Sequence, residues 1–378
     1  MNKNTINILE EQIVYENKNF YPAFPSIIKL DNKNRHLVSF RLAPKLKNNY
    51  SHLHSLSNAM LSVINNNVVD KIFEFALDDD AAKQDIQLFR VDEKTIIAYY
   101  FRYTFHPISE RNLFKYYTFI EYENTIALLS GICICISYDN GNSFSNPYII
   151  KINNNKTVMK HFAIRGSMTK IDNKILAPIY AYKKYINKNE IKYQCYIISS
   201  EDLVNWEIKC FLCETEFRNI NGKKQKIEYV EPSIIAYKNN IIAFIRTHIN
   251  NEYGLTSISY SKDKGETFSN PIFTDIKGYP LNALILNDGK LLLVYGYRLK
   301  PYGVRCIILD NVEDVFDIDK INYKSNNEEI IIDSKMKSTD CGYPWCVQNN
   351  DNSISCIYYG YKEKNKIRKI YLKTFTLN

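Results

Sequence analysis

The stretch from Glu231 to His248 holds residue types and a spacing that suggest chemistry; it reads EPSIIAYKNNIIAFIRTH. It consists of two short apolar runs around a polar turn, with Glu231 before the first run and Arg246 after the second. Apolar runs on both sides of such a turn predict a β-hairpin. A carboxylate can act as a base, and a guanidinium can bind an anion through two parallel hydrogen bonds. We therefore expect both ends of this hairpin to reach an active site.

The same hairpin pattern occurs six times along the chain, so Glu231 and Arg246 are positioned by one copy of a repeat. Its turns are centred on Asp31, Asp92, Asp172, Asn239, Asp288 and Asp351. The first and last turns are 320 residues apart over five intervals, an average of 64 residues, which leaves room for two more strands in each unit. Four strands per unit are typical of a propeller blade.

The repeat predicts an all-β fold: a six-bladed β-propeller with four-stranded antiparallel blades, forming a single domain over residues 1–378. A pair of β-sandwiches is the alternative, but sandwiches have no reason to repeat at this spacing. Helical signal is almost absent, and Leu53–Asn65 is the one segment considered as a helix.

A second motif alternates with the hairpins. Ser137–Phe144 and Ser261–Phe268 fit the pattern S-x-D-x-G-x-[ST]-[FW], known as an Asp-box, and Ser200–Trp206 is a looser copy. In such a turn the aspartate accepts hydrogen bonds from turn amides, and the glycine adopts positive φ. We expect these turns to be structural and to face away from the axis.

With six hairpins, Asp-boxes and arginines at hairpin ends, the chain from about Phe24 to Tyr359 resembles the sialidase family. The resemblance implies a hydrolase, an exo-glycosidase that removes a terminal nonulosonic (sialic-type) acid without a metal or organic cofactor. Asp-boxes are less specific for this activity than for the fold, because other propeller hydrolases and binding proteins carry them.

The resemblance implies that three arginines hold the substrate carboxylate. Arg41, in Phe-Arg-Leu-Ala-Pro, resembles the first, although one extra residue precedes the proline. Arg246 resembles the second. Arg305 is predicted as the third, with Arg298 as its competitor. Guanidinium groups suit this role because they pair with carboxylates bidentately.

The resemblance also implies an unusual nucleophile. An anionic residue would be repelled by the substrate carboxylate, so a neutral tyrosine attacks instead; Tyr343, in Gly-Tyr-Pro, is at the matching position. Glu231 would remove the phenolic proton. The general acid/base is expected in the aspartate triplet 78–80, with Asp79 chosen because it is central. Asp85 resembles a family aspartate that contacts substrate.

Charge and composition limit the partners. The net charge of +8 comes from dispersed basic residues without a nucleic-acid motif, so a small acidic sugar or glycan is expected rather than nucleic acid. Neither a signal peptide nor a membrane-spanning run is visible, which indicates a cytoplasmic location. The nine cysteines have no disulfide spacing, Cys133 and Cys135 read as core residues, and Cys210-x-x-Cys213 lacks a second pair for zinc.

Three alternatives to sialidase activity remain open on these residues. A glycosidase for another keto-acid sugar, such as a Kdo-type sugar, fits the departure around Arg41. A non-catalytic propeller that binds acidic glycans would retain the arginines. A purely structural propeller at a protein interface predicts no arginine cluster.

Overall fold

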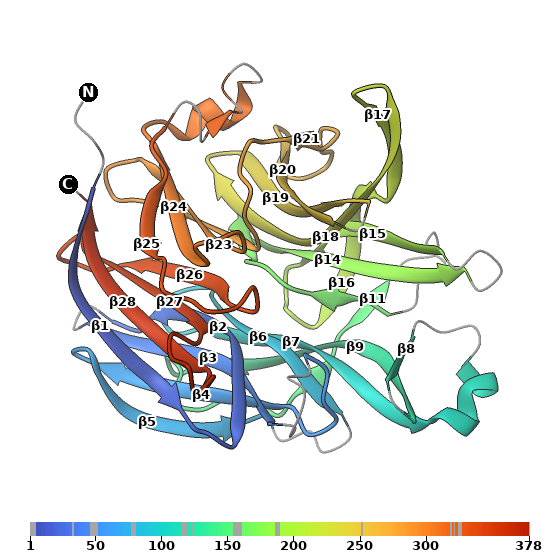
Figure 1. Cartoon of the computed structure of the whole chain (residues 1–378), viewed down its shortest axis with the longest axis horizontal. Coiled ribbons are helices and arrows are strands. Elements are labelled where there is room, and N and C mark those ends of the chain that lie inside the picture. The colour runs from blue at the N-terminus through green and yellow to red at the C-terminus, as the bar shows by residue number, and fades with distance from the viewer. Residues whose placement is uncertain are drawn as a thin grey trace.

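Six β-sheets surround a central axis in the computed structural model, and each sheet forms one blade of a propeller (Figure 1). Neighbouring strands within a blade are antiparallel, apart from the parallel pair β11–β16. The predicted all-β, six-bladed fold is confirmed, and a hairpin is present at each of the six predicted turns. The structure describes residues 5–31, 34–45, 52–76, 81–114, 119–122, 124–153, 161–185, 190–250, 252–317, 320, 322–323 and 327–377.

From the axis outwards, the first blade contains β2 (Phe20–Lys29), β3 (Arg35–Pro44), β4 (Asn58–Asn65) and β5 (Val68–Phe75). The second blade contains β6 (Ala82–Arg90), β7 (Ile96–Pro107), β9 (Thr125–Ser137) and β10 (Tyr148–Ile149), with β8 (Phe119–Tyr122) beside β9. The third blade contains β12 (Ala163–Ile164) with β13 (Thr169–Ile171), then β14 (Lys174–Tyr185), β15 (Glu190–Ser200), β16 (Asn205–Glu214) and β11 (Lys151–Asn153). In the same direction, the fourth blade contains β18 (Lys223–Tyr237), β19 (Asn240–Ile249), β20 (Glu252–Ser261) and β21 (Ile272–Phe273), with β17 (Glu216–Ile220) beside β18. The fifth blade contains β22 (Leu281–Ile285), β23 (Leu291–Tyr297), β24 (Gly303–Leu309) and β25 (Ile330–Asp333). The sixth blade contains β26 (Gly342–Gln348), β27 (Ile354–Gly360), β28 (Lys369–Leu377) and β1 (Ile6–Glu16). Short 3₁₀ helices, η1 (Ile108–Phe114) and η3 (Val312–Phe316), lie in connections.

The ring is closed by strands from opposite ends of the sequence. β1 pairs with β28 and forms the outer edge of the sixth blade, where blue and red strands lie together in Figure 1. Ion pairs join this edge to the fifth blade, because Lys373 binds both Asp333 (3.3 Å) and Glu11 on β1 (2.9 Å). Lys362 binds Asp333 as well, at 2.7 Å. Lys373 and Lys362 therefore tie the last blade to its neighbour, and Lys373 also holds Glu11 of β1.

The expectation of a helix at Leu53–Asn65 is wrong. Asn58–Asn65 is strand β4, which pairs with β3 and β5 as the third strand of the first blade. Its residues mostly alternate between buried and partly exposed, which suits a strand and leaves no helical face. Strand pairing with two neighbours outweighs the local helix propensity of Ala, Met and Leu.

The innermost strands of four blades carry a β-bulge at the same level. Two inner-strand residues stand opposite one residue of the second strand, and the bulge residue has positive φ: Phe24, Asp85, Glu231 and Tyr343, between 49° and 56°. A left-handed conformation costs an L-residue about 1–2 kcal/mol. All four side chains line one hollow at the axis. Strained backbone thus turns these side chains towards a common space.

The Asp-box turns are built as the sequence predicts. Asp139 accepts hydrogen bonds from the amide and hydroxyl of Ser143, at 2.9 and 2.6 Å, and Asp263 accepts the same two from Thr267. The glycines of both turns have positive φ. Ser261, where the second box begins, pairs with Ile241 at the opposite end of β19 from Arg246. The Asp263 carboxylate therefore closes a turn at the end of the blade remote from Arg246.

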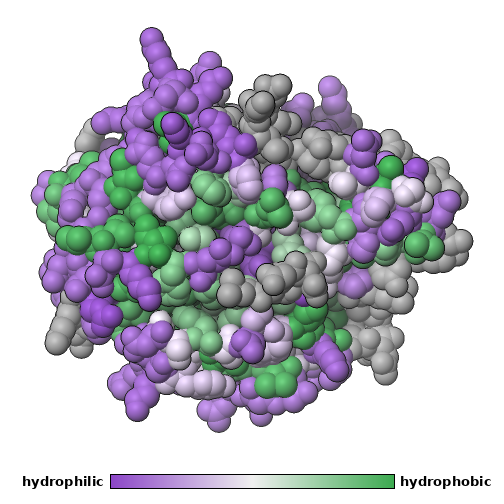
Figure 2. Space-filling model, turned by 90° about the horizontal axis from the view of Figure 1, so that it is seen from below, coloured by the Kyte–Doolittle hydropathy of each residue, from purple (hydrophilic) through white to green (hydrophobic). Residues whose placement is uncertain are grey.

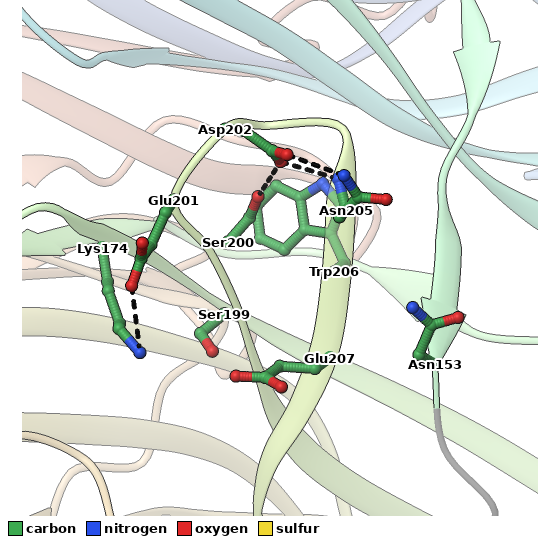
Figure 3. Close-up of a pocket in the computed structure, with 9 residues that line it drawn as sticks. All are labelled: Asn153, Lys174, Ser199, Ser200, Glu201, Asp202, Asn205, Trp206 and Glu207. Carbon is green, nitrogen blue, oxygen red and sulfur yellow. Dashed lines mark hydrogen bonds and ion pairs between the residues drawn. The ribbon is translucent and has the colours of Figure 1, made fainter.

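The looser Asp-box borders a hollow of about 280 Å³ on the third blade (Figure 3). Asp202 accepts hydrogen bonds from Ser200 and Asn205, and the Trp206 indole donates to the carbonyl of Leu203. The carboxylate and the indole are thus engaged in closing the turn.

The hydrophobic core lies between neighbouring blades. One cluster joins Leu37 and Leu61 of the first blade to Ile86 and the cysteines 133 and 135 of the second, so the expectation of core positions for both cysteines is confirmed. On the side seen in Figure 2, hydrophilic residues cover most projecting parts, with hydrophobic ones between them. Among the described residues, none of the helices has the length and apolar character needed to cross a membrane.

Candidate active site

The pocket at the axis has a volume of about 290 Å³ and is bounded by side chains from all six blades, with Arg298, just after β23, from the fifth. Its lining consists of Phe24, His52, Leu53, Gln84, Asp85, Phe101, Tyr103, Ile120, Tyr180, Glu231, Arg246, Arg298 and Tyr343. Aromatic side chains form much of the wall, and the charged groups are two arginines and two acids. The pocket is therefore apolar-walled with a few converging charged groups, as small-molecule sites usually are.

Tyr343, Glu231 and Arg246 form a closed triangle of hydrogen bonds. The Tyr343 hydroxyl donates to Glu231 Oε1 at 3.1 Å and accepts from Arg246 Nη1 at 3.2 Å. The same Arg246 nitrogen donates to Glu231 Oε2 at 2.9 Å. A hydroxyl that donates to a carboxylate while it accepts from a cation is polarised towards loss of its proton. The structure thus brings together three residues that the sequence predicted, from the fourth and sixth blades.

The surroundings shift the pKa values of Tyr343 and Glu231 in opposite directions. Burial and the negative charge of Glu231 raise the pKa of Tyr343, and Arg246 and Arg298 oppose this only in part. Burial alone would raise the pKa of Glu231, but the nearby arginines outweigh it and lower that pKa. The resting site therefore holds a neutral phenol beside an ionised carboxylate, and proton transfer needs a reaction that uses the phenolate.

Arg246 is held by a neutral imidazole as well as by Glu231. Its Nε lies 3.0 Å from His248 Nε2. Burial and the charge of Arg246 lower the pKa of His248 to about 4, so the ring is uncharged at neutral pH and can accept the hydrogen bond.

Asp85 is the second acid of the pocket, and its ionisation differs from that of Glu231. Burial, opposed by Arg165 at 3.7 Å, raises the pKa of Asp85 to about 7. The side chain is 7% exposed. Near neutral pH this carboxyl is therefore divided between its acid and its ionised form, which suits either hydrogen-bond donation to a substrate or proton exchange.

This shift predicts how stability depends on pH. The folded-state pKa of Asp85 lies above the ordinary value of 3.8, so its contribution to the free energy of unfolding is complete below pH 4 and is lost as the pH rises to about 7. Relative to the variant Asp85→Asn, the wild type should lose stability over this window, by an amount of order 4 kcal/mol. Denaturant unfolding of both proteins between pH 4 and pH 8 measures this difference.

Asp139→Asn is a matched control, since hydrogen bonds in its turn lower the pKa of Asp139 to about 2. Its stabilising contribution is present above about pH 4 and is lost only as the pH falls towards 2. A difference between wild type and Asp85→Asn that stays constant from pH 4 to pH 7 would contradict the raised pKa.

The structure brings Arg298, and not Arg305, to the pocket. Arg298 follows β23, and its guanidinium carbon lies 5.3 Å from the Tyr343 ring centroid and 5.6 Å from that of Tyr279. Arg246 stacks on the same Tyr279 ring at 4.4 Å. Arg305 lies on β24, 2% exposed, and donates to the carbonyls of Asp333 and Pro301. Backbone carbonyls of the fifth blade thus engage Arg305, which does not line the pocket.

Arg41 lies behind the pocket wall and is fully buried. Its Nε donates to Ser57 Oγ at 2.8 Å, and its guanidinium carbon is 5.8 Å from the Phe24 ring and 5.6 Å from that of Tyr21. Phe24 lines the pocket and stacks on His52 at 5.5 Å. Of the three arginines predicted to hold the carboxylate, Arg246 lines the pocket, whereas Arg41 and Arg305 are buried outside its lining.

Sequence reasoning missed a buried network next to Arg41. Asp340 accepts hydrogen bonds from the hydroxyls of Tyr21 (3.0 Å) and Tyr359 (2.7 Å) and from Nε of Arg368 (2.8 Å), and His52 Nε2 lies 3.4 Å away. Tyr21 and Asp340 are 319 positions apart in the sequence. No motif marks these residues, so the repeat alone could not have identified them.

Asp79, the predicted acid/base, and its neighbours Asp78 and Asp80 lie outside the described residues. Within the described part of the chain, no group of three or more His, Cys, Asp or Glu side chains is arranged to hold a metal ion. A second hollow of about 410 Å³ adjoins the pocket and shares three lining residues with it. It is lined by Tyr180, Tyr182, Tyr193, Glu228, Val230, Glu231, Arg246 and His248.

This chain matches a known sequence family and has the same fold as several solved structures. Residues 104–356 match the model of a family described as BNR repeat-like domain. A crystal structure of a protein of unknown function from Dyadobacter fermentans is 24% identical, with a TM-score of 0.83 over 99% of each chain. No curated protein matches the sequence.

Two solved sialidases share the fold. The Hadza microbial sialidase Hz136 is 14% identical, with a TM-score of 0.60 over 94% of this chain and 65% of its own. A Trypanosoma rangeli sialidase mutant displaying trans-sialidase activity is 12% identical, with a TM-score of 0.58 over 98% of this chain and 58% of its own. The chain thus spans less than two thirds of the length of either sialidase, and at these identities the likeness concerns the fold.

Proposed function

The chain belongs to the BNR repeat-like domain family, and from that premise we propose that it is a sialidase-like exo-glycosidase. Its substrate is a glycan that ends in a nonulosonic acid, a sugar with a carboxylate on its anomeric carbon. The observation that carries the proposal is the triangle of Tyr343, Glu231 and Arg246, with every bond at 3.2 Å or less. A tyrosine paired with a carboxylate in a pocket that also holds two arginines suits attack on an anionic sugar.

Two arginines of the pocket bind the substrate carboxylate in this proposal. Arg246 and Arg298 both line the pocket and stack on one tyrosine ring, which places their guanidinium groups close together. Arg298 takes the role first assigned to Arg305. Arg41 supports the wall from beneath Phe24 and does not contact the sugar in this state. An anionic ligand relieves the repulsion between the two cations.

The reaction proceeds in two steps with retention of configuration. The Tyr343 oxygen attacks the anomeric carbon, Glu231 takes the phenolic proton, and the glycosidic oxygen leaves with a proton from the acid/base. Water then attacks the anomeric carbon and displaces the Tyr343 oxygen, the acid/base takes a proton from that water, and Glu231 returns its proton to Tyr343. We keep Asp79 as the proposed acid/base and Asp85 as a substrate contact. No metal or organic cofactor enters these steps.

The proposal is tested by assaying the purified protein on fluorogenic methylumbelliferyl glycosides of a sialic acid, of a Kdo-type keto-acid and of a neutral hexose. We expect turnover of the sialoside, no turnover of the hexoside, and a product released first as the retained anomer by proton NMR.

Other outcomes of this assay decide between the rivals. Turnover of the Kdo-type glycoside alone would replace the sugar class. Calorimetric binding of free sialic acid without turnover of any acidic glycoside would indicate a binding protein and reject the enzyme. Absence of both binding and turnover would reject an acidic-sugar ligand altogether.

A further inference from the structure

Arg165 lies beneath the floor of the pocket, and the proposed reaction does not use it. The residue is 2% exposed and does not line the pocket. Its guanidinium carbon is 4.7 Å from the ring centroid of Tyr343 and 5.7 Å from that of Trp345. Its ion pair with Asp85 spans 3.7 Å. A buried cation is thus held against the face of the tyrosine that is proposed to attack.

The fold fixes this position through the third and fourth blades. Gly166 follows Arg165, and a Cβ at this position would lie 2.2 Å from the carbonyl oxygen of Pro232. The next residue, Ser167, is hydrogen-bonded through its amide and hydroxyl to Ser233 Oγ, at 3.2 and 2.9 Å. Pro232 and Ser233 directly follow the proposed base. Close backbone contact between the two innermost strands therefore sets where Arg165 points.

On the basis of the proposed function, we infer that Arg165 is a positioning residue for Tyr343, which orients the phenol ring and stabilises the negative charge that it gains during attack. As the phenolic proton moves to Glu231, charge spreads from the oxygen into the ring. A cation over the ring face gains attraction from that charge, beyond its attraction to the neutral ring. Arg165 should accordingly act on the chemical step, and substrate binding should change little.

The ion pair with Asp85 does not account fully for this arginine. The pKa of Asp85 is about 7, so that carboxyl is only partly ionised near neutral pH and balances the guanidinium charge only in part. The guanidinium also packs against the aromatic faces of Tyr343 and Trp345. Stacking of a planar guanidinium also restricts rotation of the ring, which a compact ammonium does less well.

The first test compares steady-state kinetics on the acidic glycoside for Arg165→Met, Arg165→Lys and the control Arg90→Lys. We expect Arg165→Met to lower kcat by about 10- to 100-fold with KM within about twofold, and Arg165→Lys to be intermediate. Arg90 lies at the turn end of the second blade, where it donates to the carbonyl of Lys29, so its variant should match the wild type.

The second test does not depend on turnover. Placing 3,5-difluorotyrosine at position 343 lowers the phenol pKa into an accessible range, and ¹⁹F NMR then reads its titration directly. Loss of the cation in the Arg165→Met background should raise that pKa by about one unit. Arg165→Lys, which keeps the charge, should give a smaller rise, and it serves if the Met variant folds poorly.

The two tests separate the inference from the proposed function. An unchanged ¹⁹F titration, or a loss that falls on KM with kcat intact, would overturn the positioning role. If the ¹⁹F shift occurs but the wild type turns over no acidic glycoside, the proposed function fails while the contact between Arg165 and Tyr343 stands.

Discussion

Replacing Tyr343 by phenylalanine is expected to lower kcat on the acidic glycoside by about three orders of magnitude or more. The variant keeps a ring that packs against Phe24 in the pocket wall, as the Tyr343 ring does at 4.8 Å between centroids, so packing is preserved. It removes the one oxygen that donates to Glu231 and accepts from Arg246. Without a covalent nucleophile the reaction can no longer proceed through two steps of lower barrier, and the resulting losses of kcat are among the largest in enzyme kinetics.

Stopped assays of the purified variant measure this effect, with binding of free sialic acid followed by calorimetry. Tyr295→Phe is the matched control, because that tyrosine is equally buried and its hydroxyl donates to Glu329 at 2.7 Å, but it lies in the fifth blade outside the pocket. Its kcat should stay near the wild-type value. A Tyr343→Phe enzyme that retains a tenth or more of the activity would rule out attack by this residue.

Glu231→Gln should lower kcat by about 10²- to 10⁴-fold, the range found for general bases. An amide has nearly the same shape and keeps one acceptor oxygen for Arg246, but its NH2 group can neither accept from Tyr343 nor take the phenolic proton. Because the arginines lower the pKa of Glu231, the wild-type base stays ionised below pH 4.5, and the acid limb of kcat should not arise from it above that pH.

The same substitution changes stability in a defined direction. A carboxylate with a lowered pKa contributes stability above its ordinary value of 4.5, and that contribution is lost as the pH falls through the folded-state value. Glu231→Gln should therefore be less stable than the wild type at pH 7, with the difference shrinking in acid. Glu228→Gln is the matched control on the same strand, since Glu228 pairs with Lys226 at 2.7 Å. A comparable fall in kcat for both variants would contradict a base at position 231.

The fold could be read from the sequence because its signals are local. Each blade begins with a hairpin whose turn residues and apolar runs are adjacent in the chain, and each Asp-box closes within eight residues. The failure at Leu53–Asn65 had the opposite cause. Asn58–Asn65 forms a strand because β3 and β5 pair with it on either side. The local sequence Asn-Ala-Met-Leu does not predict this pairing.

The site was predictable where it depends on the hairpins and not where it depends on packing between blades. Glu231 and Arg246 occupy the ends of paired strands, and the family resemblance placed Tyr343 beside them. Arg298 and Arg305 are only seven positions apart, and the choice between them depends on the carbonyl of Asp333, which belongs to another strand. Burial of Arg41 likewise depends on Ser57 and aromatic rings that no spacing rule relates to it.

The bulge residues on the innermost strands face the pocket without being needed for strand pairing. Strand pairing resumes on both sides of each bulge, so the residue at its apex contributes little to the ladder and faces the axis. Phe24, Asp85, Glu231 and Tyr343 each occupy such a position in a conformation that glycine would adopt more readily. Exchange at these four positions alone offers an evolving or engineered protein a new set of reactive groups on an unchanged ring, at a conformational cost that the scaffold already bears.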